Sequence, residues 1–400
     1  MVHVVKPTGS PGSQTSLRAA NRTRVMETLQ REGALTQVEI AGVTGLSAAS
    51  ISTLVRELND EGAVRLEPSI RNGRRATLVS LPGRRGVLAA VAIGDRDLRV
   101  AVASPSGDVL ERIRLPLPFQ HEPDETLTRA ARLVADLHAE IGRPVSDLRA
   151  VGVAMQAPVD SVSGQVGSES VLPRWSGVPL AEALQAQLRV PVQLDNDANM
   201  AALGELRAGV LTGVANACYI RASHGVGAGL VIGGEVFRGA SGTAGEIGHV
   251  TLDENGAICA CGNRGCLDTL VGSRALVESV RVSHGDLRFT DLVALADRGD
   301  VGCRRVLADA GMHLGVAVAG LVNILNPEVI VLGGDLILAQ EWVMGPLQES
   351  IERRALPSAA ASVELRPSAL GTDADLRGCF VAAAQLAPFP AVAESTYVTN

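Results

Sequence analysis

One imidazole and three thiols fall within eighteen residues of the second half of the chain, and no other feature constrains the local fold as strongly. These side chains belong to His249, Cys259, Cys261 and Cys266. Together they form a complete tetrahedral ligand set for Zn²⁺. Glycines at positions 256, 262 and 265 let the backbone turn tightly enough to bring four side chains to one point. Residues 246–268 are therefore predicted to form a metal-binding loop.

The alternative is a group of buried or disulfide-bonded thiols. A disulfide between Cys259 and Cys261 would be badly strained, and the composition is typical of an intracellular protein, in which disulfides are rare. The other three cysteines are scattered singly at positions 218, 303 and 379. A closed set of three thiolates and one imidazole leaves no open coordination position. The predicted Zn²⁺ is therefore structural rather than catalytic.

Length and composition predict a globular chain of two or three domains. Four hundred residues exceed one small core, and 46% hydrophobic with 20% charged residues exclude a disordered chain. The N-terminal region has no apolar segment typical of a secretory signal. The best candidate for a membrane span, residues 312–325, is short and is followed by Asn-Pro. We therefore expect a cytoplasmic protein without a membrane partner.

The net charge of −7 is unevenly distributed. Residues 1–86 hold 12 Lys and Arg against 7 Asp and Glu, whereas the remaining residues hold 24 against 36. A basic N-terminal region on an acidic body predicts that the N-terminal region meets a polyanion such as DNA.

Residues 16–62 carry the pattern of three helices after a predicted mobile arm at residues 1–15. The first helix is expected at residues 16–32. Thr36 and Glu39 form a capping box that begins a second, short helix, and Ser47 can cap a third. The third helix has an apolar stripe at the spacing of a buried helix face, made of Ile51, Leu54, Val55 and Leu58.

A β-hairpin is predicted after these helices, because alternating segments at residues 63–67 and 76–81 flank the turn signal Asn72-Gly73. Three helices and a basic hairpin are typical of a winged helix-turn-helix, whose recognition helix enters the major groove and whose wing contacts phosphates or the minor groove. The alternative is a small helical interaction module, and the polar face of the third helix and the basic wing favour DNA. The predicted DNA contacts are Ser47, Ser50, Ser52, Thr53, Arg56, Arg71, Arg74 and Arg75.

Strands and helices alternate beyond an expected linker at residues 81–87. Two strand–turn–strand units, residues 87–103 and 217–232, form a weak internal repeat, and the three glycines 225, 227 and 229 are expected in the second turn. Further helices are predicted at residues 127–141 and 303–325, and further strands at residues 150–155 and 329–332. This alternation predicts an α/β architecture.

A strand ends and an apolar helix begins around Asn196 and Asp197. A carboxylate at such a junction lies at the mouth of a cleft between lobes, where it can accept a hydrogen bond from a sugar hydroxyl. The alternative is that Asn196 or Asp197 caps the helix. These residues alone leave the two interpretations open.

The segment GHVTLDENGAICACGNRGC resembles the zinc signature of the ROK family, which contains repressors, open reading frames and sugar kinases. The resemblance extends over nearly the whole chain. It implies a winged helix-turn-helix at residues 16–82, followed by a two-lobed ribonuclease-H-like domain of the actin and sugar kinase superfamily. The expected lobes are residues 83–197 and 198–400. The C-terminal helix can return to pack on the first lobe.

The resemblance also implies roles for individual residues. Asp197 matches the general base of the ROK kinases, and Asn196 matches a residue that orients the sugar. Glu246 and His249 match residues that bind sugar hydroxyls. His249 can serve sugar and metal together because its two ring nitrogens are distinct.

Several positions depart from the family's pattern. Asp268 stands where a glutamate is usual, so its sugar contact could be lost, bridged by water or suited to a bulkier ligand. Residues 155–158 (Met-Gln-Ala-Pro) replace a glycine-rich loop on the sugar side. The family's first phosphate turn reads Asp-x-Gly-Gly-Thr, whereas residues 92–96 of this chain read Ala-Ile-Gly-Asp-Arg. The family's second phosphate loop reads Gly-Thr-Gly, and here His224 replaces the threonine. Both phosphate loops therefore argue against ATP chemistry.

The sequence thus predicts a sugar-responsive regulator of the repressor type, with structural Zn²⁺ and no catalytic residues. Its expected partners are an operator in double-stranded DNA, a sugar or sugar phosphate, and further copies of the chain in a homodimer or tetramer. One rival is a sugar kinase that retains a DNA-binding head. The other is a regulator whose inducer is a protein.

Overall fold

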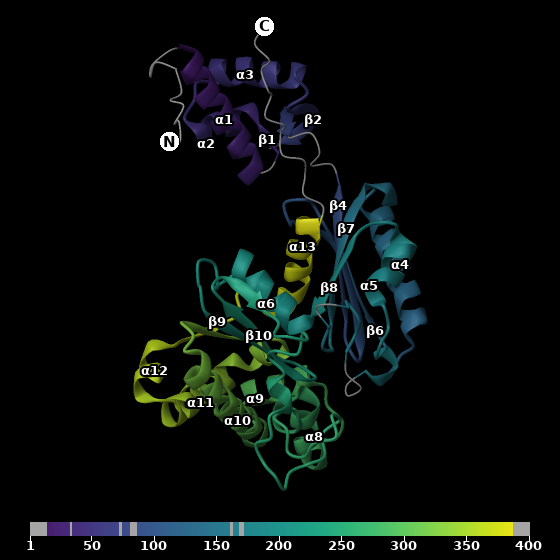
Figure 1. Cartoon of the computed structure of the whole chain (residues 1–400), viewed down its shortest axis with the longest axis vertical. Coiled ribbons are helices and arrows are strands. Elements are labelled where there is room, and N and C mark those ends of the chain that lie inside the picture. The colour runs from purple at the N-terminus through teal and green to yellow at the C-terminus, as the bar shows by residue number, and fades with distance from the viewer. Residues whose placement is uncertain are drawn as a thin grey trace, which may run out of the picture. The chain divides into compact units, whose positions relative to one another are not determined.

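The computed structural model describes residues 14–32, 34–71, 74–80, 86–160, 163–167 and 172–386. The chain divides into an N-terminal unit that ends at Gly86 and a larger unit, Val87–Ala387 (Figure 1). The predicted mobile arm lies outside the described residues except for its last two positions, which already belong to the first helix.

The N-terminal unit contains the three predicted helices, α1 (Gln14–Glu32), α2 (Gln37–Thr44) and α3 (Ala48–Asp60). The capping box of α2 forms, since the Thr36 side chain accepts from the Glu39 N–H at 3.3 Å while the Glu39 carboxylate accepts from the Thr36 N–H at 2.7 Å. Ser47 caps α3, whose apolar stripe is buried as predicted. The stripe packs on Val25, Leu29, Ile40 and Val79, and these residues form the core of the unit.

The predicted hairpin is present and is longer than expected. β2 (Arg65–Arg71) pairs antiparallel with β3 (Arg74–Ser80), and a short strand, β1 (Leu35–Thr36), joins the other edge of β3. Arg71 is paired with Arg74, which leaves the two residues expected for a tight turn between the strands. That turn and most of the predicted linker lie outside the described residues.

The larger unit is built on two five-stranded sheets of the same topology, which confirms the predicted duplication. The first sheet has the order β6-β5-β4-β7-β8 and the second the order β11-β10-β9-β12-β13. In each, three antiparallel strands are followed by two parallel ones. The strands of the first sheet are β4 (Val87–Ile93), β5 (Asp97–Ala103), β6 (Val109–Pro116), β7 (Leu148–Met155) and β8 (Val192–Asn196). Those of the second are β9 (Ala217–Ala222), β10 (Val226–Ile232), β11 (Glu235–Phe237), β12 (Val329–Gly333) and β13 (Glu364–Pro367).

Two helices, α6 (Asp197–Ala208) and α13 (Ala374–Leu386), join the sheets through one shared core. Along β4, alternate side chains point to opposite faces. Val87, Ala89, Val91 and Ile93 pack towards α4 (Pro123–Glu140) and α5 (Leu180–Leu188), whereas Leu88, Ala90 and Ala92 pack with α6 and α13. The C-terminal helix therefore lies on the first sheet (Figure 1).

The prediction that Gly227 and Gly229 belong to the turn before β10 is wrong, because both lie within the strand. Gly229 admits a helix, because a Cβ there would lie 2.4 Å from the Ala198 carbonyl oxygen of α6 and would push α6 off the second sheet. A Cβ at Gly227 would lie 3.5 Å from the Ala198 Cβ, which is an ordinary contact distance.

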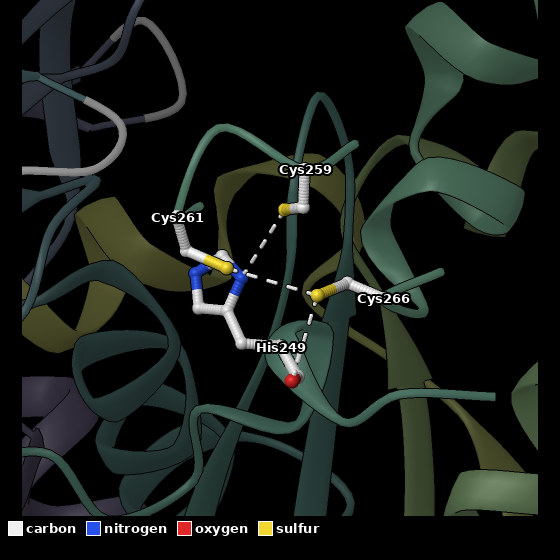
Figure 2. Close-up of side chains that lie close together, drawn as sticks. All are labelled: His249, Cys259, Cys261 and Cys266. Carbon is white, nitrogen blue, oxygen red and sulfur yellow. Dashed lines mark hydrogen bonds between the residues drawn. The ribbon is translucent and has the colours of Figure 1, made fainter. Parts of the chain in front are cut away.

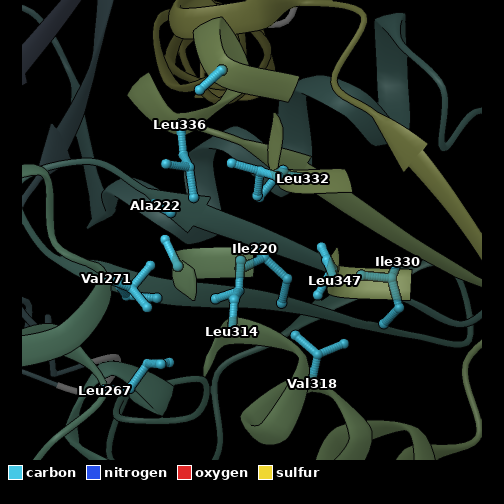
Figure 3. Packing of buried hydrophobic residues seen from close by; sticks show 14 of the residues in the cluster. Ile220, Ala222, Leu267, Val271, Leu314, Val318, Ile330, Leu332, Leu336 and Leu347 are labelled. Carbon is cyan, nitrogen blue, oxygen red and sulfur yellow. The ribbon is translucent and has the colours of Figure 1, made fainter. Parts of the chain in front are cut away.

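The longest helix, α10 (Val301–Leu325), covers the outer face of the second sheet. Its Leu314 and Val318 pack against Ile220 and Ile330 of the sheet, as Figure 3 shows. The helix begins before the apolar run singled out in the sequence, and by length and composition alone it could cross a membrane. Half of its most apolar window is buried, and the core helix of a soluble domain meets the same criterion. Its packing against α8 (Ser273–His284), α9 (Phe289–Asp297) and α11 (Gln340–Arg354) accounts for its apolar character.

Candidate functional site

The four predicted metal ligands come together. His249 ends a short 3₁₀ helix, and the three cysteines follow in a loop that brings all four ligand atoms within 4.8 Å of one another (Figure 2). Cys259 Sγ lies 3.6 Å from His249 Nδ1, and Cys261 Sγ lies 3.7 Å from Cys266 Sγ. All six cysteines are free thiols. The cluster can therefore hold a metal ion.

The backbone of the loop brings the ligands to this point. Thr251 bridges to Cys266 and Ile258 bridges to Arg264, so the loop folds back on itself twice. Gly265 has φ 63°, and a Cβ there would lie 1.6 Å from the Asp253 carbonyl oxygen, so only glycine fits. Burial raises the pKa of the Cys266 thiol to about 12, with a further contribution from its hydrogen bonds to Cys261 and Cys259. A cation among the sulfur atoms would stabilise the deprotonated, thiolate form of these cysteines.

His249 links this cluster to a group of acids. Its Nδ1 faces Cys259, whereas its Nε2 lies 3.9 Å from Glu246 Oε2. The two ring nitrogens thus face two different groups, a thiol and a carboxyl group. Burial lowers the pKa of His249, which favours the neutral ring that binds metals.

Three carboxyl groups gather next to His249. Burial raises the pKa of Glu246 to about 7, and the charges of Asp197 and Asp268 raise it further. Burial also raises the pKa of Asp268 to about 6, although its Oδ1 accepts the Val226 N–H at 2.6 Å. Buried carboxyl groups that crowd one another favour a ligand that donates several hydrogen bonds, as a sugar does.

Asn196 and Asp197 differ in their contacts. Asn196 caps α6, since its Oδ1 accepts from the N–H groups of Ala198 and Asn199 at 2.8 and 3.3 Å, and its Nδ2 donates to the Ala157 carbonyl at 3.2 Å. The capping alternative therefore holds for Asn196. Asp197 is turned towards the second sheet instead, and burial raises its pKa while the charge of Arg221 opposes that shift.

Arg221 of β9 was not singled out in the sequence, yet it contacts the predicted sugar carboxylate directly. Its Nη1 lies 3.0 Å from Asp197 Oδ2, and its Nη2 lies 3.6 Å from Asp375 Oδ2 at the start of α13. Arg99 of β5 pairs with the same Asp375. A buried charge network thus runs from the first sheet through α13 to Asp197. The sequence did carry one signal for this network, because an arginine stands inside each of two apolar strands, Ala217–Ala222 and Asp97–Ala103.

The two predicted phosphate loops face each other without forming a phosphate cradle. Ala92 stands at the place of the pattern's aspartate, and the Asp95 N–H is taken by Gln156 Oε1 at 3.0 Å. His224 Nδ1 lies 3.6 Å from Asp95 Oδ1. Arg96 stacks over the Phe119 ring at 4.8 Å from its centroid. Side chains therefore take up the positions at which backbone N–H groups would hold phosphates.

In the N-terminal unit, Ser47, Ser50, Ser52 and Arg56 are exposed along α3, and Thr53 is half-buried. Ser47 Oγ accepts the Ser50 N–H at 3.2 Å, and Thr53 Oγ1 donates to the Ala49 carbonyl at 3.1 Å. Arg71 and Arg74 lie at the end of the hairpin, next to Arg75. The structure does not describe the side chains of these three arginines.

Comparison with known proteins places the chain in a family. The model of the ROK family matches residues 88–386, and that of the MarR family matches residues 19–75. A xylose repressor of Caldicellulosiruptor bescii is 27% identical over 385 residues, covering 92% of this chain and 96% of that protein. A glucokinase of Halalkalibacterium halodurans is 32% identical over 304 residues, covering 72% of this chain and 92% of that protein.

A solved structure agrees with these relatives over both units. The crystal structure of a ROK family transcriptional regulator, described as a homologue of the E. coli MLC protein, matches with a TM-score of 0.68 and 25% identity. It covers 91% of this chain and 95% of the other. The DNA-binding head and the two-lobed domain define a sugar-responsive transcriptional regulator. The chain belongs to the ROK family.

Proposed function

We propose that this chain is a cytoplasmic repressor of genes for carbohydrate uptake or metabolism, and that it transfers no phosphate. It binds an operator through its N-terminal unit and responds to a sugar bound in the cleft of the larger unit. The observation that carries the proposal is the pairing of Asp197 with Arg221 beside intact sugar-side acids. Sugar-side carboxyl groups are retained in this arrangement, while one oxygen of the carboxylate needed for proton abstraction contacts a buried guanidinium.

A general base must have an unshared carboxylate oxygen within reach of the hydroxyl that it deprotonates. In this chain one oxygen of Asp197 lies against a buried guanidinium. The opposing phosphate loops also offer no glycine-rich cradle, and Ala92 supplies no carboxylate for Mg²⁺. Two features that phosphoryl transfer requires therefore depart from the kinase pattern, and one oxygen of the third, Asp197, is paired with Arg221.

The proposed sugar contacts are Asp197, Glu246, His249 and Asp268, with Asn196 acting through the cap that places Asp197. The carboxyl groups accept hydrogen bonds from the sugar hydroxyls, and the Nε2 of His249 faces Glu246. The names of relatives suggest xylose and N-acetylglucosamine as ligands to test. Asp268 is shorter than the usual glutamate, and its Oδ1 is already committed to the Val226 N–H. Its other oxygen remains for a ligand.

We also propose that His249, Cys259, Cys261 and Cys266 hold Zn²⁺. The donor set of three sulfurs and one ring nitrogen is the one that structural zinc prefers. The ion supplies a positive centre that fixes the loop. The chain's own contribution is to hold His249 so that Nε2 points at Glu246, which couples the shape of the loop to sugar binding.

Operator binding is assigned to α3 and the hairpin, in a homodimer or tetramer that reads a symmetric site. Binding can be measured by fluorescence anisotropy on DNA from the regulated promoter. Arg56→Ala should weaken binding by about 1–3 kcal/mol if Arg56 reads a base. Arg74→Ala or Arg75→Ala should weaken it evenly across sequences and reduce the salt dependence. A fragment lacking residues 1–86 that held the operator as tightly as the full chain would refute the assignment.

The rival function is a sugar kinase with a DNA-binding head, and the retained Asp197 is the observation in its favour. A coupled assay of ATP turnover with glucose, xylose and N-acetylglucosamine separates the two functions. The repressor proposal expects turnover well below about 1 s⁻¹, the low end for kinases. It also expects sugar to release the operator in the absence of ATP.

A further inference from the structure

A cavity of about 370 Å³ lies between the two sheets, next to Asp197 and on the side of the degenerate phosphate loops. Of the five residues predicted to bind sugar, only Asp197 lines it. Glu246, His249 and Asp268 lie outside the lining. A sugar ring held by those three residues therefore leaves this cavity to another part of the ligand. This step, like those that follow, rests on the proposed sugar-binding function.

Each arginine that lines the cavity is paired with an aspartate of the lining. It contains four arginines and five aspartates. Arg99 pairs with Asp375, Arg112 with Asp373, Arg114 with Asp97 at 2.5 Å, and Arg221 with Asp197 at 3.0 Å. The fifth carboxylate, Asp335, gives the lining a formal balance of −1 with His224 neutral.

This balance bears on which ligand the cavity can take. A phosphate group would have to pull guanidinium groups away from their carboxylates, and each broken pair would leave a carboxylate facing an anion. A sugar hydroxyl both donates and accepts, so it can bridge an arginine and its aspartate without separating them. The lining therefore favours a neutral polyhydroxyl ligand over a phosphorylated one.

The cavity has room for one further sugar unit. At about 30 Å³ for each water, it holds the volume of about twelve water molecules. Ala92, Ala154 and Leu376 supply apolar surface among the ion pairs. Alternating apolar and polar lining is what the two kinds of surface on a pyranose require.

We propose that the cavity is a second sugar subsite and that the effector of this regulator is a neutral disaccharide or longer saccharide. One ring lies at Glu246, His249 and Asp268, and the next enters the cavity beside Asp197 and its arginine. The loss of the phosphate loops then has a function of its own, because a binding site for a nucleotide is replaced by a binding site for a second sugar ring.

The test is calorimetric titration of the full-length protein with matched probes. These are glucose, cellobiose, maltose and glucose 6-phosphate, and xylose with xylobiose. We expect at least one disaccharide to bind tenfold or more tightly than its own monosaccharide. We also expect glucose 6-phosphate to bind no more tightly than glucose. Equal affinity for mono- and disaccharides, or a preference for the phosphate, overturns this inference and leaves the proposed function intact. If no sugar binds, the proposed function fails as well.

Two tryptophan variants locate the second ring. Thr372→Trp puts a bulky side chain at an exposed residue that lines the cavity, and should reduce disaccharide affinity to that of the monosaccharide. Val109→Trp adds the same side chain at an exposed residue of β6 that does not line the cavity, and should keep the disaccharide preference. A disaccharide preference that survives Thr372→Trp would place the second ring elsewhere and refute the subsite.

A charge variant tests the ion pairs. Asp97→Asn combined with Asp373→Asn leaves Arg114 and Arg112 without their partners and changes the formal balance of the lining from −1 to +1. The variant should bind glucose 6-phosphate at least tenfold more tightly than the wild type does. Unchanged affinity for the phosphate would show that the ion pairs do not set the ligand class.

Discussion

The two halves of the cleft differ in how closely they follow the pattern of a ROK sugar kinase. The sugar-side half, made of Glu246, His249 and Asp268, keeps two of the residues expected of a ROK sugar site and a shorter carboxylate at the third, and His249 joins it to the cysteine loop. The phosphate-side half, made of the Gly94–Asp97 turn with Arg221 and His224, has replaced backbone donors with charged side chains that pair with one another. In the proposed function, the first half recognises the sugar and the second no longer serves phosphoryl transfer.

This contrast indicates how a kinase fold becomes a sensor. A sensor needs binding energy that differs between two conformations, but it needs no transition-state stabilisation. Arg221 illustrates the exchange, since the same contact that engages the Asp197 carboxylate also ties the second sheet to α13 and, through Asp375, to Arg99 of the first sheet. A ligand that competes for Asp197 acts directly on a link between the lobes.

The largest expected effect comes from removing the metal. Zinc should copurify at about one ion per chain, and structural zinc sites contribute apparent binding free energies of about 10–16 kcal/mol in small peptides. Cys261→Ser should lower the zinc content, loosen residues 246–268 and remove measurable sugar binding through His249. Elemental analysis, hydrogen exchange and calorimetry measure the three effects.

Cys218→Ser is the control, because Cys218 is a buried thiol outside both groups of side chains that could hold a metal ion, and should leave the zinc content unchanged. Protein purified without chelator that contains no zinc would refute the metal assignment. Sugar binding that persists in zinc-free Cys261→Ser protein would separate the loop from the sugar site.

A smaller effect is expected from removing single carboxylates. Hydrogen bonds to charged groups contribute about 1.5–3 kcal/mol, so Glu246→Gln and Asp197→Ala should each weaken sugar binding by about 10–150-fold. Neither variant should change operator affinity without ligand, because the head is untouched. Glu246→Gln is the cleaner test, since Asp197→Ala also takes a partner from Arg221. If Asp197→Ala still released DNA at the wild-type sugar concentration, Asp197 would not be a sugar contact.

Features encoded locally could be predicted from the sequence. The metal cluster lies within eighteen residues, and the capping box and the apolar stripe of α3 are patterns of four and eight residues. The Asp197–Arg221–Asp375–Arg99 network joins residues from four elements, so no spacing in the sequence reveals it. Gly229 was misassigned to a turn for the same reason, because what it accommodates is a helix packed on the strand.

The smallest expected effect is a gain on the phosphate-side half. The wild-type protein should bind no ATP analogue measurably and transfer no phosphate to any hexose. Asp95→Gly with Arg96→Thr and His224→Thr reopens both loops and should give weak, millimolar binding, about −4 kcal/mol. Turnover should stay absent even when Arg221→Ala frees Asp197, because Ala92 provides no carboxylate for Mg²⁺. Isothermal titration and a coupled ATP assay measure the two outcomes, with Val109→Trp as a control outside the cleft. Turnover by the wild-type protein above about 1 s⁻¹ would mean that the phosphate-side half still performs chemistry, and the contrast between the halves would then be wrong.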